Sequence, residues 1–363
     1  MEYKLPMNPA NIDAKPGGRH LRVSLLLLIL CLLGLPLIGY YVPAGEMVQA
    51  QTPGAGGVTA ATNPRADYWR QVRGDVKGYS AVSGRETNEL IQASGQVWRD
   101  LRNGPLATSG AWLLALMLLA LGSFYILIGQ VKLGQQRSGR TVERWSGHER
   151  LLHWFTVACF LTLMLTGLSL LYGRAVLIPL LGHEGFSSYA MVAKTIHNYV
   201  GPLFMVGLVL MFFAWVRDNF PDPIDWQWLK EFGGMVGDRH PSACRFNAGE
   251  KIWFWLLMLV GSLVVVTGLV LDFPNFDQQR EWLQVAHLIH ATVALLLIAA
   301  ALAHIYIGTL GTEGALEGMV TGRVDESWAR QHHDLWYQEI RDSSKPSTGQ
   351  DQAGTSATEI PPP

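Results

Sequence analysis

The sequence predicts an all-α integral membrane protein with five or six membrane-spanning helices. Of its 363 residues, 49% are hydrophobic and only 16% are charged, whereas about a quarter of a typical soluble domain is charged. The apolar residues are gathered into blocks of about 20, the length that crosses a bilayer as a helix. The formal net charge of −1 provides no basic field that would indicate nucleic-acid binding.

The first apolar block, Val23 to Tyr41, has two interpretations. It is long enough to span the membrane, and it also resembles the apolar region of a signal peptide cleaved near Ala50. Residues 1–50 are therefore expected to be a signal peptide or a first transmembrane helix. Both alternatives place the residues that follow outside the cytoplasm.

Residues 51–109 are predicted to be a periplasmic segment. Its start is rich in Gly, Pro, Ser and Thr, which is typical of flexible chain. Trp69, Tyr79 and Trp98 indicate some ordered packing, for instance against a partner, and the alternative is a tethered loop with a few turns. We expect residues 42–109 to contact outer subunits.

Five further apolar blocks are expected to span the membrane. They cover residues 110–130, 151–172, 195–216, 252–271 and 285–308. The four short loops after Gly129 contain five, two, five and one Lys or Arg in turn, and basic loops face the cytoplasm. This topology places a tail, 313–341, in the cytoplasm, and a disordered C-terminus, 342–363, after it.

Histidines in these spans are the candidate functional residues. His290 and His304 lie 14 residues apart in the last span, which separates them by about 21 Å along a helix and by only about 40° around it. The topology places His197 near the outer surface and His153 near the inner one. The four histidines thus form two depth-matched pairs, His197 with His290 (the outer pair) and His153 with His304 (the inner pair).

Two such pairs can hold the irons of two b haems, one near each membrane surface. A single histidine at a helix end is more often a snorkelling or hydrogen-bonded residue. An ionisable group inside an apolar span, such as His304, indicates function. The agreement in depth of both pairs favours haem ligation, and no catalytic residue is expected in a chain that only passes electrons.

Smaller signals accompany the histidines. Gly201 follows His197 by four residues, on the face where a larger side chain would strike a porphyrin. Arg150 is a candidate contact for a haem propionate, or a positive-inside anchor. Gly167 and Gly268, each preceded by threonine, indicate either cofactor packing or close helix contact.

The remaining histidines are assigned no ligand role. His287 is a candidate neighbour of the haem site or an interfacial group. The histidines expected at the surface are His148, His183, His240, His332 and His333.

The three cysteines, Cys31, Cys159 and Cys244, lie in unrelated contexts. The sequence contains no C-x-x-C-H motif, so any haem is expected to be noncovalent. An iron–sulfur cluster would have to belong to another subunit.

Residues 143–341 resemble the gamma (cytochrome b) subunits of membrane-bound respiratory formate dehydrogenases. The resemblance is carried by ERLLHWFTVACFLTLMLTGLSLL (149–171), TIHNYVGPLF (195–204), RFNAGEKIWFW (245–255), LIHATVALLLIAAALAHIYIG (288–308) and GMVTGRVDESWARQHHDLWYQEI (318–340). The loop and tail motifs are not explained by haem ligation and are the more specific signals.

This resemblance implies a four-helix transmembrane di-haem cytochrome b bundle at 143–312, with one or two extra N-terminal helices. The family's haem-ligand histidines match His153, His197, His290 and His304. The resemblance also implies a bacterial inner-membrane location, a molybdenum or tungsten catalytic subunit, an iron–sulfur subunit outside the membrane, and a quinone acceptor near His304. Shorter family members begin near residue 135, so the resemblance says nothing about residues 1–134.

Two alternatives remain open at this point. The chain could be the cytochrome b of a hydrogenase or of another periplasmic dehydrogenase. It could instead be a non-redox membrane anchor or transporter with structural histidines, which an optical spectrum without a b-haem band would indicate.

Overall fold

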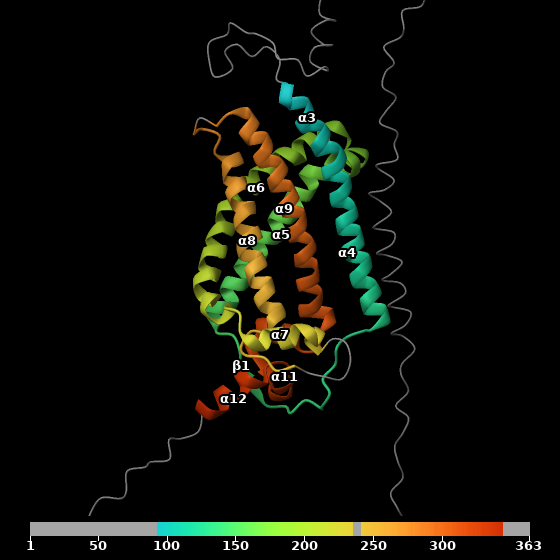
Figure 1. Cartoon of the computed structure of the whole chain (residues 1–363). Helices are drawn as coiled ribbons and strands as arrows, with labels where there is room; N and C mark the ends of the chain where they lie inside the picture. Colours follow the sequence, from blue (N-terminus) through green and yellow to red (C-terminus); the bar gives the residue numbers. More distant parts are fainter. Residues whose placement is uncertain (1–92, 235–240, 277, 344–363) are drawn as a thin grey trace, which may run out of the picture.

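The computed structural model describes residues 93–234, 241–276 and 278–343, and its centre is a bundle of long helices (Figure 1). Five helices in these residues are long and apolar enough to cross a membrane. The all-α membrane fold is therefore confirmed. The Val23–Tyr41 block and residues 344–363 lie outside the described residues.

The spanning helices are longer than the apolar blocks that predict them. They are α3 Ala93–Leu101 joined through a π-helical turn, Arg102–Leu106, to α4 Ala107–Leu127; α5 Gly147–Val176; α6 Ile178–Trp215; α8 Ala248–Asp272; and α9 Arg280–Tyr306, extended by a π-helical turn, Ile307–Gly311. The shorter elements are β1 Thr141–Glu143, α7 Pro223–Lys230, α10 Ala315–Thr321, β2 Arg323–Asp325, α11 Glu326–His332 and α12 Asp334–Ser343, with 3₁₀ turns at Val216–Asn219 and Phe232–Gly234.

Four of the long helices form the bundle. α5 packs against α6, α8 packs against α9, and α6 joins the two hairpins by packing on α8. α4 lies outside this bundle, against α9 (Figure 1). Gly110 permits this close approach, because a Cβ there would collide with Leu295 of α9 and lie 2.9 Å from the Tyr172 hydroxyl.

Two helix starts differ from the predicted ones. The helix that leads into α4 begins at Ala93, not near residue 110, so the end of the predicted 51–109 segment is helical. Pro105 is accommodated in the π-helical turn, which absorbs its missing N–H. α6 begins at Ile178, not near residue 195, and its early helical turn is broken at Gly182, whose φ of 71° suits glycine.

The helices α5 and α8 begin with equivalent capping boxes. The Ser146 side chain accepts from the Glu149 N–H while the Glu149 carboxylate accepts from the Ser146 N–H. Asn247 and Glu250 do the same for α8. Each box satisfies two N–H groups that a helix start leaves unpaired, and so defines where the helix begins.

A small folded cap covers one end of the bundle, the end with α7, β1, α11 and α12 in Figure 1. β1 pairs antiparallel with β2, with Val142 opposite Val324. The cap has its own core, and its buried members are Val324, Trp328, Ala329, Trp336 and Tyr337. The tail predicted at 313–341 is thus a folded element of this capped end.

A buried cation lies between the cap and the bundle. The Arg144 side chain is 2% exposed and pairs with Glu250 at 3.1 Å. Its guanidinium lies 5.1–5.3 Å from the ring centres of three tryptophans, Trp145, Trp328 and Trp336. Such cation–π contacts stabilise a desolvated cation.

His333 corrects one prediction. It was expected at the surface but is 1% exposed, because its Nδ1 bonds the Cys244 carbonyl at 2.8 Å and its ring packs against Trp328 and Trp336. Among the other histidines of this group, His148 and His183 are exposed, and His240 lies outside the described residues.

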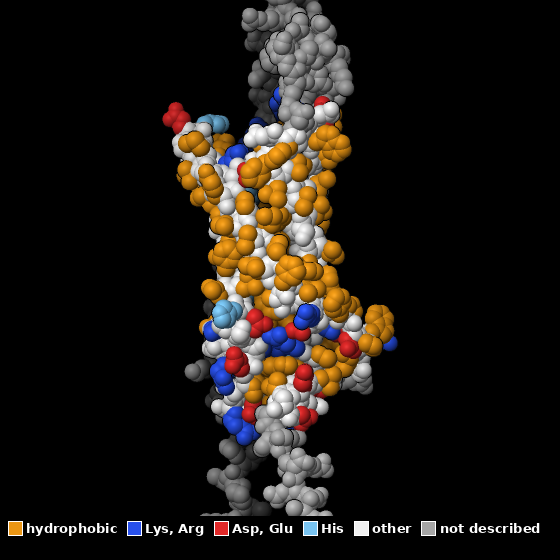
Figure 2. All heavy atoms as spheres, turned by 90° about the vertical axis from the view of Figure 1, so that its left-hand side faces the viewer, with side chains coloured by type: hydrophobic (Ala, Val, Ile, Leu, Met, Phe, Trp, Pro, Cys, Tyr) orange, Lys and Arg blue, Asp and Glu red, His pale blue; other side chains and the backbone are white. Residues whose placement is uncertain are grey.

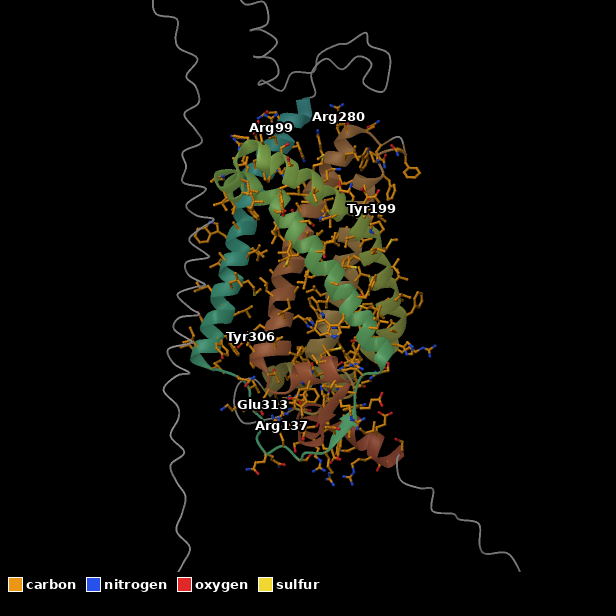
Figure 3. The ribbon with its side chains drawn as sticks, turned by 180° about the vertical axis from the view of Figure 1, so that it is seen from behind. Arg99, Arg137, Tyr199, Arg280, Tyr306 and Glu313 are labelled. Atoms are coloured by element: carbon orange, nitrogen blue, oxygen red, sulfur yellow. The ribbon has the colours of Figure 1, made fainter. Side chains whose placement is uncertain are left out.

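The outer surface matches a membrane environment. Hydrophobic side chains cover the middle of the bundle, while Lys, Arg, Asp and Glu gather at the capped end (Figure 2). Apolar residues as large as Leu165, Phe213 and Leu259 are more than 60% exposed, which water-soluble monomers avoid over so wide an area. Arg99 and Arg280 lie at the opposite end, and Arg137 and Glu313 lie at the capped end (Figure 3). The chain is a multi-pass membrane protein.

Candidate functional site

The structure brings the outer pair together. His197 projects from the middle of α6 and His290 from the first half of α9. Their ring centres are 6.2 Å apart and their planes are inclined by 74°. The early start of α6 places His197 well inside a helix rather than at its beginning, yet at the same level as His290.

This separation fits a metal ion between the two rings. Imidazole nitrogens bind transition metals at about 2.0–2.1 Å, and the ring centre lies roughly 1.1 Å behind the nitrogen, so two rings on opposite sides of one ion have centres about 6.3 Å apart. The observed 6.2 Å meets this requirement. In the described part of the chain, no three His, Cys, Asp or Glu side chains group as a metal site, so the available donor set is a pair of histidines.

Hydrogen bonds orient both rings of the outer pair. His197 Nδ1 lies 2.8 Å from Thr166 Oγ1 on α5. His290 Nδ1 lies 3.2 Å from Thr267 Oγ1 and 3.0 Å from the Val264 carbonyl, both on α8. Because Nδ1 is engaged in each ring, Nε2 is the nitrogen that remains for a metal.

Glycines surround the same rings. A Cβ on Gly167 would lie 3.3 Å from His197 Cε1, and a Cβ on Gly268 would lie 3.1 Å from His290 Cε1. Both glycines therefore make room for the imidazoles themselves. A Cβ on Gly201 would meet nothing within 4 Å, so the space beside this glycine is open.

The inner pair lies at the capped end. His153 is in the second turn of α5 and His304 is in the last turn of α9. His304 stacks on Trp253 with ring centres 4.5 Å apart and planes inclined by 9°. His153 Nδ1 is buried without a hydrogen-bond partner among the described residues, a condition that ordinarily calls for an additional group.

Arg150 lies one turn before His153 and contacts the cap. Its Nη1 donates to the Val320 carbonyl at 2.7 Å, while its Nε is buried without a hydrogen-bond partner among the described residues. One edge of the guanidinium is therefore held by α10.

The helix before α4 reaches the outer pair's end of the bundle. Trp98 of α3 packs edge-on against His287, with ring centres 5.4 Å apart and planes inclined by 79°. His287 lies one turn before His290. The ordered packing expected of Trp98 is therefore within this chain.

Sequence inspection missed the two threonines. The Thr-Gly pairs drew attention only to the glycines, whereas Thr166 and Thr267 are the residues that bond the histidines. The sequence does contain a signal for these threonines. Each directly precedes a glycine, Gly167 or Gly268, in the span that comes before a histidine-bearing span.

Comparison with known proteins gives consistent matches. The family model described as "Prokaryotic cytochrome b561" matches residues 144–322. The "Formate dehydrogenase, nitrate-inducible, cytochrome b556(Fdn) subunit" of Escherichia coli (strain K12) is 32% identical over 197 residues, which are 53% of this chain and 88% of that protein.

Two further relatives carry similar names. The "Formate dehydrogenase, cytochrome b556(fdo) subunit" of the same strain is 28% identical over 209 residues, 56% of this chain and 96% of the relative. The "Formate dehydrogenase, cytochrome b556 subunit" of Haemophilus influenzae is 30% identical over 196 residues, 52% of this chain and 79% of the relative.

Proposed function

Since the chain belongs to the family of formate dehydrogenase cytochrome b556 subunits, we propose that it is the haem-carrying membrane subunit of a formate dehydrogenase complex. In such a complex this chain is the cytochrome component and does not itself oxidise formate. The observation that carries the proposal is the outer pair, whose ring centres stand 6.2 Å apart.

The proposal includes two b haems. His197 and His290 would be the axial ligands of the outer one, and His153 and His304 those of the inner one. With both axial positions taken by protein, such a haem exchanges single electrons and binds neither oxygen nor substrate. Gly201 would border the outer porphyrin, and Arg150 would contact a propionate of the inner one.

The partners follow from the same proposal. A molybdenum or tungsten subunit would oxidise formate outside the membrane, and an iron–sulfur subunit would deliver electrons on that side. A quinone would accept electrons near His304 at the capped end. We place the chain in the bacterial inner membrane with the capped end and C-terminus in the cytoplasm, because the loops at this end contain most of the basic residues.

Residues 42–109 would contact the outer subunits, since α3, which lies in this segment, begins at the end opposite the cap (Figure 1). A chain without residues 51–92 should then lose part of its association with these subunits. Co-purification of the full complex at unchanged yield would refute this part of the proposal.

Haem stoichiometry tests the central claim. The complex purified from native membranes should contain two b haems per copy of this chain, and both should be reduced by formate in an optical difference spectrum. Reduction by hydrogen instead would assign the chain to a hydrogenase. A chain without a b-haem band would be a non-redox membrane protein.

The pairing is tested by single replacements. His197→Ala and His290→Ala should remove the same haem, and His153→Ala and His304→Ala should remove the other. His183→Ala, on α6 but exposed, is the matched control and should keep both. Loss of one and the same haem from the His197 and His304 variants would contradict the pairing.

A further inference from the structure

The two helices that face the outer pair are copies of one pattern. Residues 144–149 read RWSGHE and residues 245–250 read RFNAGE, an offset of 101 positions, and the same offset relates the Thr-Gly pairs at 166–167 and 267–268. The capping boxes at the starts of α5 and α8 are equivalent in structure as well. The helices α5 and α8 thus share one pattern, from the residues before their starts to the Thr-Gly pair.

Ion pairs cross between the two copies reciprocally. Arg144, before α5, binds Glu250 at the start of α8 at 3.1 Å. Arg245, before α8, binds Glu149 at the start of α5 at 2.6 Å. The repeat therefore holds in three dimensions and relates α5 to α8 within the bundle.

The repeated threonine makes the same bonds in both copies. Thr166 Oγ1 donates to the Thr162 carbonyl at 2.7 Å, and Thr267 Oγ1 donates to the Leu263 carbonyl at 2.7 Å. A hydroxyl has a single proton. Because that proton is used within its own helix, the oxygen can only accept from the histidine, and each imidazole must donate its Nδ1–H.

Among the described residues, the inner pair has no equivalent hydrogen bond between a threonine and a histidine Nδ1. The offset relates His153 to Phe254, which is a buried core residue, and His153 Nδ1 has no hydrogen-bond partner among the described residues. The threonine contact is therefore specific to the outer pair and is not a general consequence of packing histidines in this bundle.

We propose that Thr166 and Thr267 are the positioning residues of the outer haem site, each accepting the Nδ1–H of the facing histidine and so fixing the tautomer, orientation and basicity of an axial ligand. This inference rests on the proposed haem ligation by His197 and His290. An acceptor on Nδ1–H makes an imidazole a stronger donor to its metal, and a stronger donor favours oxidised over reduced iron.

The two threonines should contribute unequally to the orientation of their histidines. Among the described residues, Thr166 is the only hydrogen-bond partner of His197 Nδ1, whereas His290 Nδ1 also has the Val264 carbonyl at 3.0 Å. Removal of the Thr166 hydroxyl should therefore affect its histidine more than removal of the Thr267 hydroxyl affects His290.

The experiment is a redox titration of both haems in the purified full complex, with wild type, Thr166→Val, Thr166→Ser, Thr267→Val and the control Thr292→Val. Within the described part of the chain, Thr292, on α9, donates only to the Leu288 carbonyl of its own helix. In Thr166→Val one haem should become easier to reduce. At a given potential its oxidised-to-reduced ratio should fall by about three- to tenfold, which corresponds to a rise of about 28–59 mV in the midpoint potential of a one-electron couple. The haem that shifts should be the one that His197→Ala removes.

The companion variants give the remaining outcomes. Thr267→Val should shift the same haem by less, and Thr166→Ser and Thr292→Val should match wild type. If Thr166→Val releases the haem, Thr166→Ser must still retain it with the wild-type potential. Unchanged potentials in Thr166→Val, or a serine variant that behaves like valine, would overturn the inference while leaving haem ligation intact. A wild-type complex without two haems would instead overturn the proposed function.

Discussion

Gly268→Ala is the substitution that examines the outer pair most directly. The added Cβ would lie 3.1 Å from His290 Cε1 and 3.5 Å from its Nδ1. The ring cannot retreat freely, because Nδ1 is bonded to the Val264 carbonyl and to Thr267. The imidazole must therefore move by a few tenths of an ångström away from the position in which it faces His197.

Overpacking of this kind costs about 1–3 kcal/mol. The cost falls on the haem-bound state, in which the ring must point at the iron, and corresponds to about 5- to 140-fold weaker retention of the outer haem. Alanine also gains about 1 kcal/mol of helix propensity over glycine. This gain is present with and without haem, so it does not change haem binding.

Gly261→Ala is the matched control. It lies on the same helix, α8, and its added Cβ would also lie 3.1 Å from its nearest neighbour, but that neighbour is the Leu208 Cδ1 methyl. A leucine end can rotate away, whereas a hydrogen-bonded imidazole cannot. Gly261→Ala should therefore retain both haems.

The assay is the haem-to-chain ratio of purified protein, together with the rate of haem transfer to excess apomyoglobin and the helix content by circular dichroism. Gly268→Ala should lose the outer haem faster than wild type with unchanged helix content. The reasoning is refuted if Gly268→Ala holds this haem as tightly as wild type, or if Gly261→Ala releases it equally fast.

Three further predictions concern the surroundings of the site. Gly110→Leu should separate α4 from α9, because even a Cβ at this position collides with Leu295. Protease cleavage of the connection at residues 128–140 should then increase while the haem content stays constant. Unchanged cleavage would contradict the packing of α4 on α9. Arg144→Leu should destabilise the cap by about 2–4 kcal/mol, since it removes three cation–π contacts and leaves Glu250 without its Arg144 partner. Hydrogen exchange of residues 323–343 should therefore become faster. Exchange as slow as in the wild type would exclude a structural role for this cation. Burial, and secondly the Arg144 cation, hold the pKa of His333 well below 6.5. Below about pH 6.5 the unfolded cap therefore binds a proton that the folded cap does not, and the stability of the cap should fall as the pH falls. Equal hydrogen-exchange protection of residues 323–343 at pH 7.5 and 5.5, after correction for intrinsic exchange, would show that His333 is not buried in its neutral form.

The all-α membrane fold was predictable because its signal is local. A block of apolar residues needs no knowledge of its neighbours to be recognised as a span, and the 100° rotation per residue places His290 and His304 on one face of a single helix. The residues at which the helices begin were harder to predict from the sequence. α6 begins 17 residues before the predicted start, because the glycines, serines and two charges that interrupt the apolar run in residues 178–194 do not prevent a helix that packs against α5.

Burial of polar groups depended on contacts between distant segments. Nothing local to His333 distinguishes it from the adjacent His332, yet it is buried because α11 and α12 fold back on Arg144 and the Cys244 carbonyl. Arg144 itself belongs to a run of loop cations that the positive-inside pattern explains without any burial. Only the folded cap separates this residue from the others.

Composition, periodicity and the alternation of basic loops predicted from the sequence alone a bundle of membrane helices and two depth-matched histidine pairs, since each of these signals lies in a continuous stretch of the chain. Tertiary structure decided which histidines actually face each other, which hydroxyls hold them and which charges are buried. These features depend on how α5, α6, α8 and α9 are placed side by side, and side chains 23 or 31 residues apart, such as Thr267 with His290 and Thr166 with His197, meet only after the helices pack.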